Sequence, residues 1–544
     1  MSFHVRQIRE DRTPSDFVQG KPRKLPVVTK KARNIFKQNP LTRWFATWRQ
    51  KKNDDDDDEP HAITLKRIFS VLVGLLCALL VLTAFAKVLF TLRIITLDNV
   101  ISVAGTAPAV DEYGMTNILL LGHGGAGHDG IDLTDSMMVM SIDARETQSV
   151  AMLSLPRDLY FLHTDKMGAG RVNSLYRDYK SYLRSEEDLE STEASQQALR
   201  ELGDEIGRTF GLPIHHIVKI DFAGFEQAVD EIDGVDIEVP YDIVDTEYPD
   251  ENYGFQTFSM KAGLQHMDGT TALKYARSRH TTSDFDRSAR QQQLIKAMAE
   301  KAETMGLQND PVKIASLVSS LAKNIETTMT VSEMVGLANV ARKLDRERII
   351  AFQLNDRNGL YGSFTEPGGF LYAPPREEFE GASVLLPVSI PPFPVTWKQI
   401  QTLVTLLQTE RPTYVARPTF AVLNAGARSG LARQLAGELI RYGFDVPVIE
   451  NASLEDQAAS TFSIASMDDQ ALGEKLAALL GLNVVPLPAA LPSEEIRRFT
   501  IILGEDYTFT SLQDLVRKNR LQALRQFRGR VDIDLDLNAV RKRA

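Results

Sequence analysis

The chain has 544 residues, of which 43% are hydrophobic and 25% charged, and its formal net charge at pH 7 is −10. This length suits roughly two to four domains, and the composition excludes a wholly disordered, collagen-like or coiled-coil protein. The acidic balance argues against nucleic acid as a partner, and the single cysteine, Cys77, excludes intramolecular disulfides and multi-cysteine metal sites.

The N-terminal segment predicts a membrane anchor. Residues 1–67 carry 16 Lys and Arg against 9 Asp and Glu, a net of +7, and residues 68–86 form a run without any charge. As a helix this run matches a hydrocarbon core of about 30 Å, so we predict one transmembrane helix over 68–90. Because the basic flank precedes it, residues 1–67 are expected in the cytoplasm and the later domains outside the plasma membrane.

Strands alternating with helices predict an α/β or α+β sandwich over residues 112–385. Asp268 is expected to cap the N-terminus of one helix and Gly234 the C-terminus of another. The expected strands are 117–121, 136–142, 150–154, 217–220 and 235–239, and the expected helices are 222–232, 268–275, 286–305 and a helical stretch over 310–346.

A second, smaller α/β domain is predicted over residues 417–508, behind a Pro-rich linker and helix at 386–416. A basic tail, 509–544, follows, and the alternation of apolar and acidic residues at 531–537 predicts an edge strand. The expected strands of the smaller domain are 420–423, 446–449 and 500–503, and its expected helices are 431–442 and 471–480.

Three polar clusters lie in the first part of the predicted sandwich, the first two of them at the ends of predicted strands. The glycine-rich loop from Gly122 to Gly130 contains His123, His128 and Asp129 and leads to Asp132 and Asp135; it would let the backbone approach a phosphate, or it is a flexible turn. The next cluster is Arg157 with Asp158, for which a surface ion pair is the alternative. The third, Arg171 and Asn173, is a polar step in a predicted loop.

The fourth cluster is the richest in arginine, with four in the 14 residues 277–290. Arg277 and Arg279 share one side of an extended segment, while Arg287, Arg290 and Gln291 share a helix face. Convergence of these guanidinium groups on one phosphate is one interpretation, and a helix face paired with Asp284 and Asp286 is the other. Together the clusters offer carboxylates for a divalent ion and arginines for a phosphoryl-transfer site.

The ordered runs TDSMMVMSID, LSLPRD, RVNSLY, KIDFAGFEQAVDEIDGVDIEVP, GLQHMDGTTALKYARSRH and DFDRSARQQQLIKAM resemble the catalytic domain of the LytR-CpsA-Psr family over about 112–304, with its helical end reaching about 385. Residues 417–508 resemble the LytR C-terminal domain. The resemblance implies an αβα sandwich with a central mixed sheet and a lipid groove. It also implies a phosphotransferase that moves a glycopolymer from a polyprenyl pyrophosphate carrier to peptidoglycan through a phosphodiester.

The resemblance also implies roles for particular residues. Mg²⁺, with Mn²⁺ as the alternative, would bind at Asp135, but Gly124 replaces the aspartate of the family's Gly-x-Asp step, so Asp129 or Asp132 would substitute, or Asp135 would act with phosphate oxygens alone. The implied catalytic residues are Arg157, Asp158, Arg277, Arg279 and Asp284, and the implied substrate-binding residues are Arg287, Arg290, Gln291, Arg171 and Asn173.

Gly124 also favours an alternative from another class, a non-catalytic protein that binds polyprenyl pyrophosphate or serves as a cell-wall scaffold. A transcriptional attenuator is a third hypothesis. The expected position of the candidate residues outside the membrane argues against it.

Overall fold

The computed structural model describes residues 105–520, except for 126–129, 251–253, 279–283, 356–368, 388–395 and several positions between 308 and 322. The chain divides into two compact units, Met1–Ile94 and Ile95–Ala544, and every described residue belongs to the second. The predicted transmembrane helix and the predicted edge strand at 531–537 therefore lie outside the described residues. Among the helices that are described, none combines the length and apolar character needed to span a bilayer.

The larger domain is built on a six-stranded mixed sheet in the order β11-β6-β1-β2-β3-β12. β1 pairs antiparallel with β2 and parallel with β6, and β3 pairs antiparallel with β2 and parallel with β12. The strands predicted at 117–121, 136–142, 150–154 and 217–220 are confirmed. The bounds are β1 Thr116–His123, β2 Thr134–Asp143, β3 Ser149–Leu155, β6 His216–Asp221, β11 Ile325–Thr327 and β12 Ile349–Gln353.

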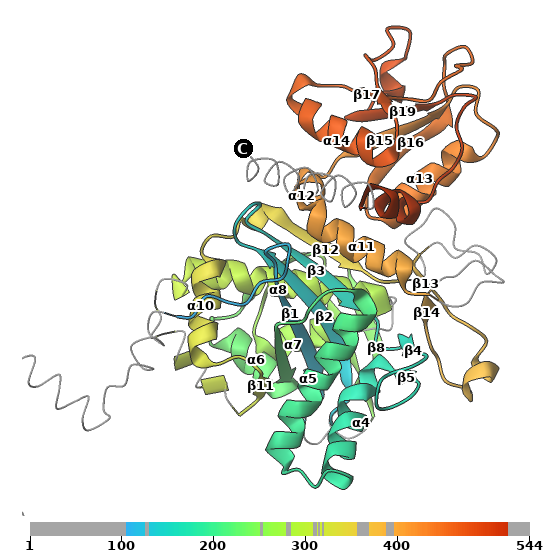
Figure 1. Ribbon diagram of the computed structural model, residues 1–544. Coiled ribbons are helices and arrows are strands. Elements are labelled where there is room, and N and C mark those ends of the chain that lie inside the picture. The colour runs from blue at the N-terminus through green and yellow to red at the C-terminus, as the bar shows by residue number, and fades with distance from the viewer. Residues whose placement is uncertain are drawn as a thin grey trace, which may run out of the picture. The chain divides into compact units, whose positions relative to one another are not determined.

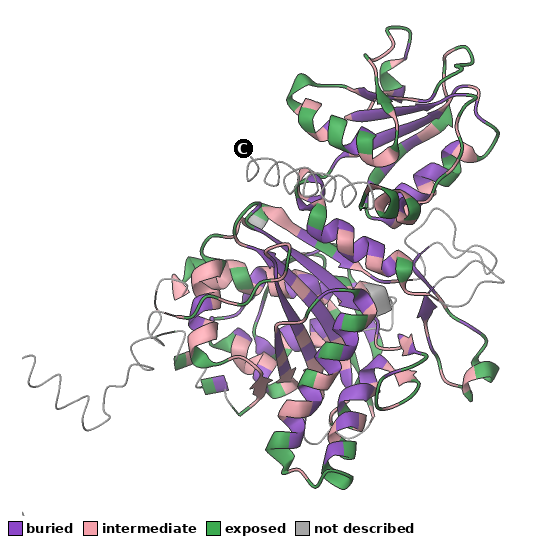
Figure 2. Ribbon diagram, in the orientation of Figure 1, coloured by how far each residue is buried: buried purple, intermediate pink, exposed green. Residues whose placement is uncertain are grey.

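Helices cover both faces of this sheet, as Figure 1 shows. Because side chains alternate along a strand, Leu119 and Leu121 of β1 join a core with α4 and α5, whereas Ile118 joins a core on the other face with Ile295 of α8. The strands are largely buried and the exposed residues lie mainly on the helices and loops (Figure 2). The bounds are α4 Val172–Ser185, α5 Ser191–Phe210, α6 Phe222–Asp230, α7 Gly269–Arg277, α8 Asp284–Thr304 and α10 Val331–Ala341.

One of the two predicted caps is confirmed: the side chain of Asp268 accepts a hydrogen bond from the Thr271 N–H at the start of α7. The other needs correction, because α6 ends at Asp230 with Glu231 as its C-cap. Gly234 lies beyond this end, where it has a φ of 71° and donates its N–H to the Val229 carbonyl.

Three further expectations need correction. The helical stretch predicted over 310–346 is interrupted by β11, because these residues add an antiparallel edge strand beside β6. The predicted loop at Arg171–Asn173 instead ends a short strand and begins α4. Arg277, expected in an extended segment, is the last residue of α7.

Small paired strands and 3₁₀ turns complete the larger domain. β7 pairs with β10 and β8 pairs with β9, both antiparallel. The bounds are β4 Tyr160–Phe161, β5 Gly170–Arg171, β7 Val235–Val239, β8 Ile243–Pro249, β9 Phe255–Met260, β10 Gly263–Met267, η4 Arg346–Arg348, β13 Leu371–Tyr372, η5 Arg376–Phe379 and β14 Leu386–Pro387.

The smaller domain contains a five-stranded sheet in the order β16-β15-β19-β17-β18. All three predicted strands and both predicted helices are present, while β17, antiparallel to β19, was not predicted. Two helices precede this domain, α11 Lys398–Thr409 and α12 Arg411–Ala416. The bounds within it are β15 Thr419–Asn424, α13 Leu431–Arg441, β16 Asp445–Asn451, β17 Thr461–Ile464, η6 Met467–Asp469, α14 Gln470–Leu480, β18 Asn483–Val484, η7 Ser493–Glu495 and β19 Phe499–Leu503.

Candidate active site

A cavity of about 610 Å³ lies against the face of the central sheet that α8 covers. Its walls are mostly apolar side chains contributed by β1, β2, β6, α6, α7 and α8. These are Leu120, Met138, Val218, Ile220, Phe222, Phe225, Leu273, Leu294, Ile295 and Met298. Five of the polar residues predicted for the site also line the cavity, namely Asp135, Arg157, Arg277, Arg287 and Gln291.

Two of the three cavity arginines meet at Asp135, near the start of β2. Arg157 follows β3, and its Nη1 lies 3.6 Å from Asp135 Oδ1. Arg287, in the first turn of α8, is only 5% exposed and donates from Nη2 to the Asp135 carbonyl oxygen at 3.3 Å. Two arginines separated by 130 positions in sequence therefore contact one residue, Arg157 at the Asp135 carboxylate and Arg287 at the Asp135 backbone carbonyl.

Arg277 reaches the same cavity from the end of α7 and is held by two aromatic residues that sequence analysis missed. Its guanidinium carbon lies 4.1 Å from the centroid of the Phe222 ring, and its Nη1 donates to the Tyr248 hydroxyl at 3.3 Å. Burial raises the pKa of Tyr248, so its hydroxyl stays neutral. Stacking on Phe222 leaves the guanidinium edges available for hydrogen bonds to a ligand.

Gln291 is placed by the sheet as well as by its own helix. Ser136 donates from Oγ to Gln291 Oε1 at 2.8 Å, and Gln291 Nε2 lies 3.5 Å from the Ala276 carbonyl oxygen. The predicted shared face of Arg287 and Gln291 therefore turns toward the cavity.

Arg290, predicted to bind substrate from the same face, has a different position. It is 4% exposed, and it donates from Nε to the Tyr275 carbonyl at 2.9 Å and from Nη2 to the Ser278 carbonyl. Three residues turn a helix by about 300° and four by about 400°, so Arg290 and Gln291 diverge to opposite sides of Arg287. Arg290 is thus committed to the last carbonyls of α7.

The N-terminus of α4 orients Asp135. Thr134 donates from Oγ1 to the Asn173 carbonyl at 3.3 Å, and Asn173 donates from Nδ2 to Asp135 Oδ1 at 3.1 Å. Asn173 is 3% exposed, and its Oδ1 is buried without a hydrogen-bond partner among the described residues.

Asp158 and Arg171 lie beside Arg157, but neither of them lines the cavity. Asp158 Oδ1 is 3.8 Å from Arg157 Nε and 3.4 Å from Arg171 Nη1. A carboxylate between two guanidinium groups is suited to holding Arg157 in place.

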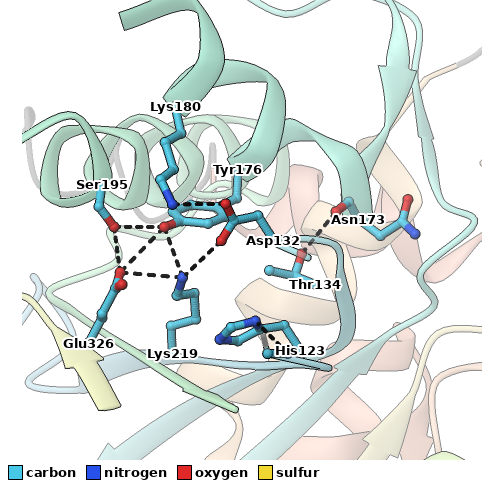
Figure 3. A network of polar contacts seen from close by, with 10 residues as sticks. His123, Asp132, Thr134, Asn173, Tyr176, Lys180, Ser195, Lys219 and Glu326 are labelled. Atoms are coloured by element: carbon cyan, nitrogen blue, oxygen red, sulfur yellow. Dashed lines mark hydrogen bonds and ion pairs between the residues drawn. The ribbon is translucent and has the colours of Figure 1, made fainter. Parts of the chain in front are cut away.

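Asp132, a predicted metal ligand, instead belongs to a separate ion-pair network (Figure 3). Its carboxylate lies 2.8 Å from Lys180 Nζ and 3.5 Å from Lys219 Nζ, and it is not among the residues that line the cavity. Burial alone would raise the pKa of Asp132, but the two lysines lower it below its usual value. Both carboxylate oxygens of Asp132 are therefore paired with lysines and do not belong to the predicted metal site.

Lys219 is the centre of this network and is only 2% exposed. It donates to the Tyr176 hydroxyl at 2.8 Å and lies 3.3 Å from a Glu326 oxygen, which also accepts from Ser195. Burial raises the pKa of Tyr176 well above its usual value, so the phenol stays neutral. A single lysine within an otherwise apolar predicted strand was the available sequence signal for such a buried pair.

His123 packs beside the same network in Figure 3. Its Nδ1 accepts a hydrogen bond from the Gly125 N–H at 3.2 Å. Burial, with a further contribution from Lys219, lowers the pKa of His123 and favours the neutral imidazole.

The donor set around Asp135 fits a hard divalent cation that also binds phosphate. Carboxylate and amide oxygens are the ligands such ions prefer, and Asn173 Oδ1 is an unpartnered oxygen in the residue that bonds Asp135. Within the described ranges, three or more His, Cys, Asp or Glu side chains nowhere gather as a metal site. Asp129, Arg279 and the side chain of Asp284 lie outside the described residues.

Comparison with known proteins identifies relatives of the larger domain. Polyisoprenyl-teichoic acid–peptidoglycan teichoic acid transferase TagV of Bacillus subtilis is 28% identical over 211 residues, 38% of this chain and 48% of the relative. Cell wall biosynthesis protein LcpA of Corynebacterium glutamicum is 27% identical over 210 residues, 37% of this chain and 39% of the relative. The chain thus spans about half or less of the length of these two relatives.

Among solved structures, that of B. subtilis TagV has a TM-score of 0.38 and 20% identity, covering 56% of this chain and 99% of that one. The model of the LytR cell envelope-related transcriptional attenuator domain matches residues 417–507. The model of the LytR_cpsA_psr family matches residues 97–369, half of the chain, and the protein therefore belongs to this family.

Proposed function

We propose that this protein is a phosphotransferase that moves a glycopolymer from a polyprenyl pyrophosphate carrier to peptidoglycan. The observation that carries the proposal is the convergence of Arg157, Arg277 and Arg287 on one largely apolar cavity. An isoprenyl chain requires apolar walls, and a diphosphate requires several fixed cationic donors. Relatives named as polyisoprenyl-teichoic acid–peptidoglycan transferases bring substrates of this chemistry to the same family.

The proposed reaction is a single displacement at phosphorus. A hydroxyl oxygen of the peptidoglycan acceptor attacks the phosphorus next to the glycopolymer, the bond from that phosphorus to the bridging oxygen breaks, and polyprenyl phosphate leaves. The hydroxyl proton passes to solvent. Arg157, Arg277 and Arg287 stabilise the negative charge that spreads over the phosphoryl oxygens, and Asp158 positions Arg157.

A divalent cation, Mg²⁺ before Mn²⁺, is part of the proposal. Asp135 would hold it, with Asn173 as a neighbouring oxygen donor. When bound, such an ion neutralises charge on the diphosphate.

The test is a reconstituted assay with the full chain, a short glycan on polyprenyl pyrophosphate and a peptidoglycan fragment, with polyprenyl phosphate measured by mass spectrometry. Release that depends on the acceptor supports transfer. Binding of the lipid without release would instead support the non-catalytic carrier-binding alternative. Arg177→Ala is the control for substitutions of the cavity arginines, because Arg177 is 48% exposed, pairs with Asp178 and does not line the cavity.

The proposal includes a single-pass anchor at 68–90 with the later domains outside the plasma membrane. Cys77 is the only cysteine, so a Cys77→Ala background allows single cysteines to be placed elsewhere. In intact cells freed of their wall, a membrane-impermeant maleimide should label Ser185→Cys, whose site is exposed, and should label Ser15→Cys only after lysis. Labelling of both or neither in intact cells would contradict this topology.

A further inference from the structure

We infer that Asp221 supplies a second carboxylate to the divalent-cation site proposed at Asp135. The sequence departs from the family at Gly124. Of the two nearby acidic candidates, Asp132 is held by Lys180 and Lys219, and Asp129 lies outside the described residues. The inference deepens the proposed function, but its test does not depend on turnover.

Asp221 lies at the same level of the sheet as Asp135. β1 separates β2 from β6, and His123 of β1 is paired with Thr134 on one side and with Asp221 on the other. Asp135 follows Thr134 directly, so the two aspartates stand on the strands that flank β1. Two strand spacings separate such backbones by roughly 10 Å, a gap that two side chains and a hydrated ion can bridge. Both aspartates line the cavity that holds the arginines.

Gly125, just after β1, lies close to the Asp221 side chain. A Cβ atom on Gly125 would lie 3.0 Å from Asp221 Cβ and 3.3 Å from Asp221 Oδ2, and the φ of Gly125 is +77°. Both the space and the backbone conformation therefore require glycine at this position. The absence of a side chain at Gly125 thus leaves the Asp221 carboxylate room.

Only one of the Asp221 oxygens is committed within the described part of the chain. Oδ1 accepts from the Gly224 N–H at 2.7 Å and caps α6, whereas no described residue donates to Oδ2. On the other flank of β1, the buried Asn173 Oδ1 also has no hydrogen-bond partner, although Asn173 Nδ2 bonds Asp135. For the buried Asn173 oxygen the missing donor is unfavourable, and a cation coordinated nearby would relieve it; the half-buried Asp221 Oδ2 is open to a ligand.

The donor set matches how Mg²⁺ and Mn²⁺ are held beside phosphates. Such ions are usually bound by one or two carboxylates, with waters and phosphate oxygens completing the shell, rather than by a cage of protein ligands. Asp135 and Asp221 are two carboxylates on one cavity. They belong to β2 and β6, the two strands that flank β1 in a single sheet.

The test measures binding of Mn²⁺ alone to the full chain by electron paramagnetic resonance, with Asp221→Asn as the variant. Asparagine caps helices as well as aspartate does, so α6 should be kept while the ligand charge is lost. Asp268→Asn is the matched control, because Asp268 caps α7 in the same way, accepting from the Thr271 N–H at 2.8 Å, and does not line the cavity.

Mn²⁺ affinity should fall roughly tenfold or more in Asp221→Asn and in Asp135→Asn, and should be unchanged in Asp268→Asn. Thermal unfolding without metal should be the same for Asp221→Asn and Asp268→Asn. The inference is overturned if Asp221→Asn binds Mn²⁺ as the unmodified chain does, or if the unmodified chain binds none. If the binding pattern holds but no polymer is transferred, the proposed function fails and the cation site stands.

Discussion

Asp135 and Arg157 lie just beyond the last residue pair of the β2–β3 ladder, Met137 with Leu155, and Arg157 Nη1 is 3.6 Å from Asp135 Oδ1. Arg157 itself is in the turn that follows β3. The antiparallel pairing of β2 with β3 brings the start of one strand and the end of the other to the same edge of the sheet, where this carboxylate and this guanidinium meet.

Arg157→Ala should reduce polymer transfer by about 100-fold or more, because it removes a guanidinium that the proposed reaction uses to stabilise the phosphoryl oxygens. Arg157→Lys should recover only part of this loss, since an ammonium cannot form paired hydrogen bonds with phosphate. The release of polyprenyl phosphate measures both variants. Near-normal release by Arg157→Ala, with a normal unfolding transition, would remove Arg157 from the site.

Arg290 and Arg277 should separate stability from transfer. Arg290→Met leaves the carbonyls of Tyr275 and Ser278 without their buried donor and should lower the free energy of unfolding by about 2–3 kcal/mol. Arg277→Ala removes a cavity guanidinium stacked on Phe222 and should mainly reduce transfer. Urea unfolding and the release assay should be applied to both variants. The assignment of a structural role to Arg290 is wrong if Arg290→Met is as stable as the unmodified chain.

Lys219→Met should lower the free energy of unfolding by about 3 kcal/mol, because it leaves the carboxylates of Asp132 and Glu326 without their shared ammonium. Asp132 has a φ of 70°, which asparagine tolerates, so Asp132→Asn is a suitable partner in a double-mutant cycle. The double variant should lose less stability than the sum of the single variants.

The surface pair Lys261–Asp242 provides a control for this cycle, since Lys261 is 84% exposed. Lys261→Met should leave the unfolding transition nearly unchanged. Strict additivity of Lys219→Met and Asp132→Asn would show that the two residues do not act together.

The protein should become less stable as the pH falls from 7.5 to 5. Burial lowers the pKa of His123, His215 and His216 below the value of about 6.5 expected in an unfolded chain. The unfolded state therefore binds more protons in this range, and the stability contributed by the neutral imidazoles, complete above about pH 6.5, is lost on acidification. Urea unfolding at several pH values measures the slope. His123→Gln should reduce that slope without abolishing it, and an unchanged slope would contradict the role assigned to His123.

Local pattern predicted much of the fold correctly. β3 is a continuous run of seven buried residues, and Asp268 occupies the cap expected of it, because these signals act within a few residues. Local sequence pattern failed where the secondary structure of a segment depends on the strand with which it pairs. β11 is a three-residue edge strand that exists through its pairing with β6, and its own residues lie in a stretch that looks helical.

The candidate site shows the same division. Sequence and family resemblance selected Asp135, Arg157, Arg277, Arg287 and Gln291, and the structure brings these to one cavity. It also separates Arg290 and Asp132 from them, and it adds the supports Phe222 and Tyr248.

Residue types and their order along the chain were enough to establish family membership, the succession of strands and helices and the kind of chemistry available. Which polar side chains share a cavity depended on strand register, helix rotation and the burial of each guanidinium or carboxylate. These are long-range properties, because a side chain's partners lie on elements distant in sequence, and a buried charge is stable only where such a partner meets it. Packing therefore assigned Arg287 and Arg290, three residues apart, to different tasks.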